Sequence, residues 1–198
     1  MSTTVILLAA GQSKRFGGIK QLAEVGPRAL INHCLMQFFS NNKLVDNIDE
    51  LFVILGSNRD KIQAVIPDYI KTHFVENWSL GMGQSIAESV KNLSISNSHI
   101  FIILADQIAI STEIVNKMLL TSTVHPSKIV AAQYSQQLGV PAIFPAQYLN
   151  QLQNLTGDKG ARNIIQQNIQ NVVSLSIPEA AYDIDTPEDL LMYIQQTK

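Results

Sequence analysis

Short apolar runs rich in valine and isoleucine alternate along the chain with longer segments in which apolar residues recur every three or four positions. The short runs are typical of buried strands, and the longer segments are typical of amphipathic helices. The predicted strands cover residues 5–9, 51–55, 72–75, 100–104, 129–133 and 172–176. The predicted helices cover residues 29–40, 59–65, 84–93, 112–120, 145–152 and 161–167.

A further helix near the end of the chain has the clearest start signal. Thr186 is suited to the N-cap, Pro187 to the first helical position, and Glu188 and Asp189 to a first turn that favours acidic side chains. The pattern therefore predicts a helix that begins at Pro187.

The order of these elements predicts an α/β fold in which helices cover a largely parallel sheet. The 198 residues contain no internal repeat and no linker-like shift in composition, so we expect a single domain over residues 1–198. The polar segments 41–47 and 94–98 are predicted surface loops. Ligands of such sheets bind outside the carboxyl ends of the strands, which directs attention to Gly11, Gly56 and Asp106.

Composition and charge restrict the possible partners. The chain is 46% apolar, and its formal net charge is −2, so no overall field attracts it to nucleic acid or to a membrane. The longest apolar stretch, 100–110, is interrupted by Asp106 and Gln107 and is too short to span a bilayer. Cys34 is the sole cysteine and cannot form an internal disulfide, so we expect a reduced, cytoplasmic setting.

The loop after the first predicted strand combines three glycines with cations. Glycines leave backbone N–H groups accessible to an anion, and Lys14, Arg15 and Lys20 add positive charge within one short segment. Five residues separate Gly11 from Gly17 and no Gly-Lys-Ser/Thr follows, so the spacing fits neither a Walker A loop nor G-x-G-x-x-G. The loop is either a polyphosphate cradle or simply a tight connection.

Carboxylates follow two of the predicted extended segments. Asp106 ends a buried apolar run, where an aspartate either caps a turn or presents oxygen to a hard cation such as Mg²⁺. Asp183 and Asp185 stand two residues apart, so in an extended segment they point to the same side and Ile184 to the other. Stabilisation of the positive end of the following helix is the other reading of these two side chains.

Residues 8–22, LAAGQSKRFGGIKQL, resemble the L-A-A-G-x-S-x-R-x-G-x-x-K-x-L signature of the nucleotidyltransferases that build molybdenum cofactor dinucleotides. That family belongs to the glycosyltransferase-A-like nucleotidyltransferase superfamily. Further segments resemble the family in the same order along the chain: WSLGMGQS at 78–85, LADQ at 104–107, GVPAIF at 139–144, LTGDKGAR at 155–162 and DIDTPEDL at 183–190. The resemblance implies a three-layer, Rossmann-like nucleotidyltransferase fold with a mixed, mainly parallel central sheet.

The resemblance also implies roles for individual residues. It assigns nucleotide binding to Leu8, Ala9, Ala10, Gly11, Ser13, Arg15, Lys20, Gly83 and Ser85. It assigns catalysis to Arg15, Lys20 and Asp106, and Mg²⁺ binding to Asp106 and Asp185, with Asp183 ranked after Asp185. It assigns acceptor binding to Gln107, Pro141 and Arg162.

The activity implied is transfer of a nucleoside monophosphate from an NTP to a phosphorylated acceptor. The pair Ala9-Ala10, where the guanine-specific branch typically has two glycines, points to CTP. Molybdopterin is the implied acceptor, and a molybdoenzyme could receive the product. Ile19 and Ile108 replace usual prolines, and Val140 stands where the cytidylyltransferases commonly have histidine, so acceptor recognition departs most from the family.

Two other functions compete with this interpretation. Residues 83–87 imitate the nucleophile elbow of a serine hydrolase, and Ser85, Asp106 and His125 follow in the hydrolase order, although no regular strand feeds the turn. A nucleotide-binding accessory protein with little catalytic activity is the second alternative.

Overall fold

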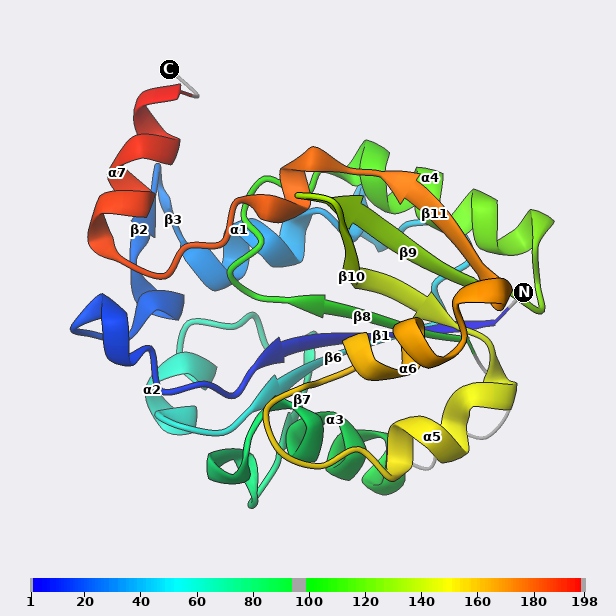
Figure 1. Ribbon diagram of the computed structural model, residues 1–198. Coiled ribbons are helices and arrows are strands. Elements are labelled where there is room, and N and C mark those ends of the chain that lie inside the picture. Colours follow the sequence, from blue (N-terminus) through cyan, green and yellow to red (C-terminus); the bar gives the residue numbers. More distant parts are fainter. Residues whose placement is uncertain (1, 94–98, 197–198) are drawn as a thin grey trace.

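The computed structural model describes residues 2–93 and 99–196, so the predicted loop 94–98 lies outside the described residues. A seven-stranded sheet in the order β11-β9-β10-β8-β1-β6-β7 forms its centre (Figure 1). The strands are β1 (Thr3–Ala9), β6 (Glu50–Leu55), β7 (Lys71–Phe74), β8 (His99–Leu104), β9 (Ile129–Tyr134), β10 (Gln137–Phe144) and β11 (Val172–Ser176). β10 pairs antiparallel with β8 and β9, and the other neighbours are parallel, which confirms a mixed, mainly parallel sheet.

Helices cover both faces of this sheet. They are α1 (Leu30–Met36), α2 (Arg59–Gln63), α3 (Met82–Asn92), α4 (Thr112–Val124), α5 (Leu149–Gln153) and α6 (Arg162–Gln167), while a further helix, α7 (Pro187–Gln196), packs in a separate core. Val5 and Leu7 of β1 belong to the core under α1, α2 and α4, whereas Ile6 and Leu8 belong to the core under α3, α5 and α6. Strands buried on both faces appear in the sequence as continuous apolar runs, which is why the pattern located strands such as β1 and β8. The sheet between two layers of helices confirms the predicted three-layer fold.

The last helix begins at Pro187, as predicted. It packs with Cys34 of α1, Ile108 and Ile184 in a small third core. In Figure 1 it stands at one end of the molecule, beside the hairpin of β2 (Glu24–Val25) and β3 (Arg28–Ala29). Within the described residues, no helix is both long enough and apolar enough to cross a membrane.

The helix predicted over residues 29–40 extends further at its C-terminal end than the helix in the structure. α1 stops at Met36, and the chain then forms a hairpin of β4 (Phe39–Ser40) and β5 (Lys43–Leu44). Asn41 and Asn42 form its turn with φ of 51° and 61°, a conformation that asparagine tolerates better than most residues. Two residues suited to a tight turn therefore end the helical segment earlier than the apolar spacing suggests.

Candidate active site

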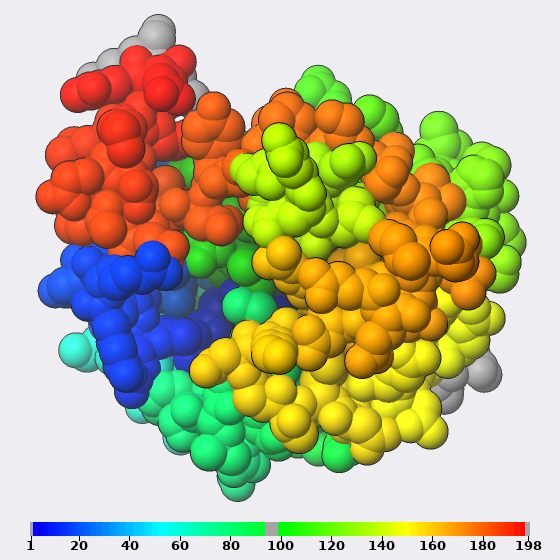
Figure 2. Space-filling model, viewed as in Figure 1, coloured from blue at the N-terminus to red at the C-terminus, as the bar shows by residue number. Residues whose placement is uncertain are grey.

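A cavity of about 600 Å³ opens at the carboxyl ends of β1 and β8. Figure 2 shows this face hollowed between the N-terminal segment, in blue, and the C-terminal segment, in orange. The lining residues from the predicted set are Leu8, Ala9, Ala10, Gly11, Ser13, Arg15, Lys20, Ser85, Asp106 and Asp185. Asp183, the metal candidate ranked after Asp185, also lines the cavity. The lining residues that were not predicted are Gln12, Lys14, Gln21, Trp78, Ser79, Gly81, Met82, Leu104, Ala105 and Asp158.

The loop after β1 is shaped by a buried glutamine. Ser13 has φ of 55°, which turns the chain into a short 3-10 helix over Lys14–Phe16. Gln21 is 2% exposed; its side chain accepts a hydrogen bond from the Ser13 hydroxyl at 3.2 Å and donates one to the Ala9 carbonyl at 3.4 Å. These bonds tie the loop to the end of β1 and leave its outer part, with Lys14 and Arg15, exposed to the cavity.

Lys20 joins two carboxylates that are distant in sequence. Its Nζ lies 2.5 Å from Asp106 Oδ2 and 3.3 Å from Asp185 Oδ1, and its side chain is 12% exposed. Arg15 lies 2.8 Å from the other oxygen of Asp185, but its side chain is 72% exposed. Burial lowers the pKa of Lys20, yet attraction and hydrogen bonds from Asp106 and Asp185 outweigh burial and raise it. The ammonium is therefore charged at neutral pH.

Backbone contacts hold the two carboxylate segments together. The Ile184 N–H donates to the Asp106 carbonyl at 3.0 Å, and Gln107 pairs with Asp183 in an isolated antiparallel bridge. Asp183 and Asp185 both line the cavity while Ile184 is buried in the third core, as the alternation predicted. The segment thus delivers its carboxylates beside Asp106.

The start of α7 fixes the position of Asp185 from the other side. Asp189 accepts hydrogen bonds from the N–H groups of Asp185, at 3.0 Å, and Thr186, at 2.8 Å. Its own N–H donates to the Thr186 hydroxyl at 3.2 Å, which completes a capping box. The backbone hydrogen bond from Thr186, foremost, lowers the pKa of Asp189. The predicted stabilisation of this helix start is confirmed for Asp189.

Two carboxylate oxygens in the site have unused bonding capacity. Asp106 Oδ1 and Asp183 Oδ1 are buried and have no hydrogen-bond partner among the described residues. Burial, followed by the charges of Asp106 and Asp185, raises the pKa of Asp183 to about 7. The residues described include no group of three or more histidine, cysteine or acidic side chains placed to hold a metal. Asp106 and Asp185 nevertheless face one cation, and Mg²⁺ typically binds one or two carboxylates plus substrate phosphates, so the pair fits such an ion.

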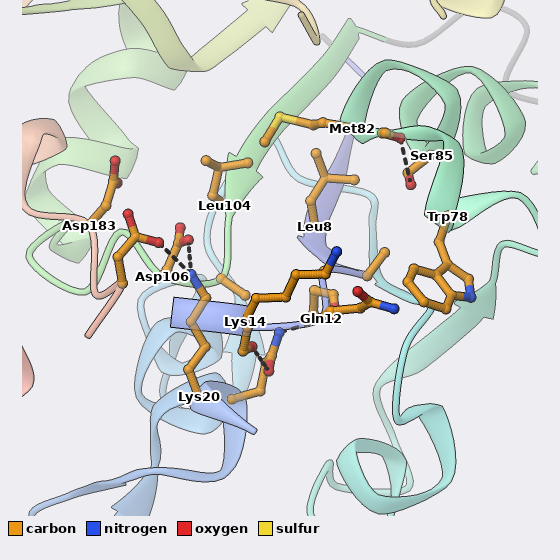
Figure 3. A pocket seen from close by; sticks show the side chains of 18 of the residues that line it. Leu8, Gln12, Lys14, Lys20, Trp78, Met82, Ser85, Leu104, Asp106 and Asp183 are labelled. Atoms are coloured by element: carbon orange, nitrogen blue, oxygen red, sulfur yellow. Dashed lines mark hydrogen bonds and ion pairs between the residues drawn. The ribbon is translucent and has the colours of Figure 1, made fainter. Parts of the chain in front are cut away.

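Gly83 and Ser85 lie at the start of α3. The Gly83 N–H donates to the Gly157 carbonyl at 2.7 Å, and a Cβ on Gly83 would come within 2.8 Å of the Thr156 carbonyl oxygen. Gly83 therefore packs against the 156–157 loop and does not line the cavity. Ser85 lines the cavity, and its hydroxyl donates to the Gly81 carbonyl at 3.3 Å (Figure 3).

The three residues assigned to the acceptor do not line this cavity. Gln107 is 2% exposed and its amide is bonded within the protein, Pro141 is buried in β10, and Arg162 is exposed at the start of α6. Their acceptor roles stay predictions. The structure instead brings Trp78, Met82 and Asp158 to the cavity; these lie in the matched segments 78–85 and 155–162, which was the signal that could have found them.

The comparison with known proteins agrees with this geometry. Residues 5–172 match the MobA-like NTP transferase domain family. The chain belongs to that family and is an NTP transferase. Among curated proteins, no sequence matches the chain significantly.

Solved structures share the fold over the whole chain. A homologue of Mycobacterium tuberculosis Rv0371c from Mycobacterium sp. strain JC1 has a TM-score of 0.80 at 25% identity, covering 99% of this chain and 98% of that one. Rv0371c of Mycobacterium tuberculosis H37Rv in complex with manganese has a TM-score of 0.76 at 21% identity, covering 98% and 99%. Molybdopterin-guanine dinucleotide biosynthesis protein A of Archaeoglobus fulgidus has a TM-score of 0.70 at 12% identity, covering 98% of each chain.

Proposed function

We propose that the protein transfers CMP from CTP to a phosphorylated acceptor, with Mg²⁺ as cofactor and molybdopterin as the acceptor, and that it does so as one cytoplasmic domain spanning residues 1–198. The observation that carries the proposal is that Asp106 and Asp185 both contact the Lys20 ammonium, beside the glycine-rich, cationic loop. A molybdoenzyme that receives the product is the corresponding protein partner.

The proposed reaction needs positioning and charge neutralisation. An acceptor phosphate oxygen is already ionised near neutral pH, so its attack on the α-phosphorus requires no general base. Among the described residues, no histidine lines the cavity. Asp106 and Asp185 would hold Mg²⁺, which neutralises phosphate charge when bound. Lys20 and Arg15 would stabilise the charge that develops on the leaving pyrophosphate.

The base preference rests on the small residues at the end of β1. Ala9 and Ala10 line the cavity, and the family resemblance associates this pair with cytosine. The solved relative named for molybdopterin-guanine dinucleotide shares the fold, so the overall architecture does not distinguish the two bases. We expect CTP with Mg²⁺ to raise the melting temperature more than GTP with Mg²⁺, because ligand binding stabilises the folded state. Equal shifts would remove the claim for cytosine.

The decisive test is turnover. The purified protein is incubated with each NTP, Mg²⁺ and molybdopterin, and released pyrophosphate is measured. We expect release with CTP, and a loss of about 10² to 10³ in rate for Asp106→Asn. Asp60→Asn is the matched control, because Asp60 is 88% exposed and pairs with Arg59 outside the cavity. Nucleotide binding without turnover would favour the accessory protein instead.

The hydrolase alternative lacks geometric support. Ser85 lies inside α3, and its hydroxyl is bonded to the carbonyl one turn earlier. A nucleophile elbow requires a strand that leads into the serine, whereas the preceding residues Trp78–Leu80 form a 3-10 turn. Absence of labelling by a fluorophosphonate would agree with this conclusion.

A further inference from the structure

Gln107 directly follows Asp106, but its side chain turns away from the cavity into the protein. It is 2% exposed and does not line the cavity. A glutamine amide that is buried this completely needs partners for its donors and its acceptor, because an unpaired buried amide is costly. The identity of those partners indicates what the residue does.

Its partners come from three separate parts of the chain. Nε2 donates to the Val140 carbonyl at 3.0 Å and to the Ala180 carbonyl at 3.2 Å. Oε1 accepts from the Leu104 N–H at 3.3 Å, at the end of the strand that leads to Asp106. One side chain thus connects β8, β10 and the 3-10 turn Pro178–Ala181, which precedes the segment with Asp183 and Asp185.

These bonds lie next to the backbone contacts that join the carboxylates. We call the contact between segments 106–107 and 183–184 the carboxylate junction. It consists of the bridge between Gln107 and Asp183 and the hydrogen bond from the Ile184 N–H to the Asp106 carbonyl. The amide of Gln107 holds Ala180, three residues before Asp183, and so fixes where the segment enters the junction. The hydrogen bonds of the Gln107 side chain to Leu104, Val140 and Ala180 thus hold both segments that carry the carboxylates.

We propose that Gln107 is a positioning residue that sets the spacing of Asp106 and Asp185 for a divalent cation and its bound nucleotide phosphates. This inference rests on the proposed function, because that function supplies the cation. Residues behind metal ligands orient them, and their loss weakens metal binding by about 10- to 100-fold. A role in contacting the acceptor would instead leave metal binding unchanged in the absence of acceptor.

The test measures Mn²⁺ binding without acceptor. MnCl₂ is titrated into the full chain with CTP, and in parallel with GTP, and free Mn²⁺ is followed by electron paramagnetic resonance. Gln107→Met, which keeps the size of the side chain and removes the amide, should weaken Mn²⁺ binding by about 10- to 100-fold. Nucleotide affinity measured in EDTA should stay within about twofold, since that binding does not need the carboxylate spacing.

A matched control separates positioning from general stability. Gln37 also ties two elements, since it donates to the His33 carbonyl of α1 and accepts from the N–H and hydroxyl of Thr112 of α4. Gln37→Met should lower the melting temperature yet leave Mn²⁺ affinity unchanged. Equal weakening in both variants would overturn the proposal, because the effect would then follow from loss of stability.

The remaining outcomes distinguish a failure of the role proposed for Gln107 from a failure of the proposed metal site. Wild-type affinity for Mn²⁺ in Gln107→Met, while Asp106→Asn binds none, would overturn the role of Gln107 and leave the metal site intact. Absence of Mn²⁺ binding by the wild type with either nucleotide would refute the proposed metal site itself. If Gln107→Met does not fold, Gln107→Asn, whose amide is one methylene too short, is judged by the same criterion. Failure of both variants to fold would overturn the proposal in favour of a purely structural role.

Discussion

Replacement of Lys20 by methionine tests the electrostatics of the site directly. In the folded protein the ammonium lies between two carboxylates, at 2.5 Å from Asp106 and 3.3 Å from Asp185. Methionine fills similar space but leaves the carboxylates facing each other, with the exposed Arg15 as the remaining cation on Asp185. Lys20 donates hydrogen bonds to two charged carboxylates, each bond contributing about 1.5 to 3 kcal/mol, and desolvation of the lysine offsets part of that gain. We therefore expect a loss of about 2 to 3 kcal/mol without metal.

The assay is thermal unfolding in EDTA and in MnCl₂. For a chain of this size each kcal/mol shifts the melting temperature by about 2 to 4 °C, so Lys20→Met should melt roughly 5 to 10 °C lower in EDTA. Mn²⁺ should restore more stability to the variant than to the wild type, because the ion neutralises the two carboxylates that have lost the lysine. Lys14→Met, in the same loop and exposed, is the control and should change little.

The pH dependence of this difference follows from the direction of the pKa shift. The pKa of Lys20 is raised above its ordinary value of 10.5, so its contribution is complete below that value. The contribution then declines as pH rises through the folded-state pKa. The reasoning is refuted if Lys20→Met is as stable as the wild type in EDTA at pH 7, since the two carboxylates would then need no cation between them.

Three further predictions concern residues around the site. Asp189→Ala removes one side of the capping box and should cost about 1 kcal/mol in urea unfolding at pH 7. Because the pKa of Asp189 is lowered, the difference should vanish as pH falls through its folded-state pKa; a constant difference down to pH 2 would contradict this. Gly81→Ala should cost about 2 to 3 kcal/mol, because Gly81 has φ of 113° and a Cβ would lie 2.5 Å from the Gly157 backbone; urea unfolding with wild-type stability would disprove it. Cys34 should react with a disulfide reagent only on unfolding, because burial raises the pKa of its thiol and the residue is 4% exposed; rapid labelling of the native protein would refute this.

The sequence pattern located every strand of the central sheet except β10, and it also missed the hairpin of β4 and β5. β10 was overlooked because Gly139 and Pro141 are unfavourable in strands, and the ladder accommodates them with a register shift between Gly139 and Ala142. The hairpin of β4 and β5 was missed because its two-residue strands carry no periodic signal. The pairing of β10 with β8 joins residues far apart in sequence, whereas the hairpin of β4 and β5 is local but too short to produce a period.

The chemistry of the site could be predicted further than its supporting contacts. The family resemblance implied that Lys20, Asp106 and Asp185 belong to one site, whereas residue types and spacing alone left other readings open. The structure brings the Lys20 ammonium into contact with both carboxylates. The burial of Gln21 and Gln107 could not be predicted, because a glutamine beside a charged motif residue looks the same in sequence whether it faces ligand or core. Burial distinguishes the two cases, and burial of a polar residue next to a loop depends on the tertiary fold.

The antiparallel direction of β10 explains how distant segments reach the same cavity edge. Phe144, at the end of β10, pairs with Ile100 near the start of β8, whereas Ala142 pairs with Ile102. The start of β10, with Gly139 and Val140, therefore lies beyond the carboxyl end of β8, next to Gln107. A parallel strand in this position would bring its end there and place Val140 away from Asp106. Because β10 runs antiparallel to β8 and β9, its first residues lie beside Gln107. The segment that resembles the family's acceptor-side motif therefore starts at the edge where β8 ends.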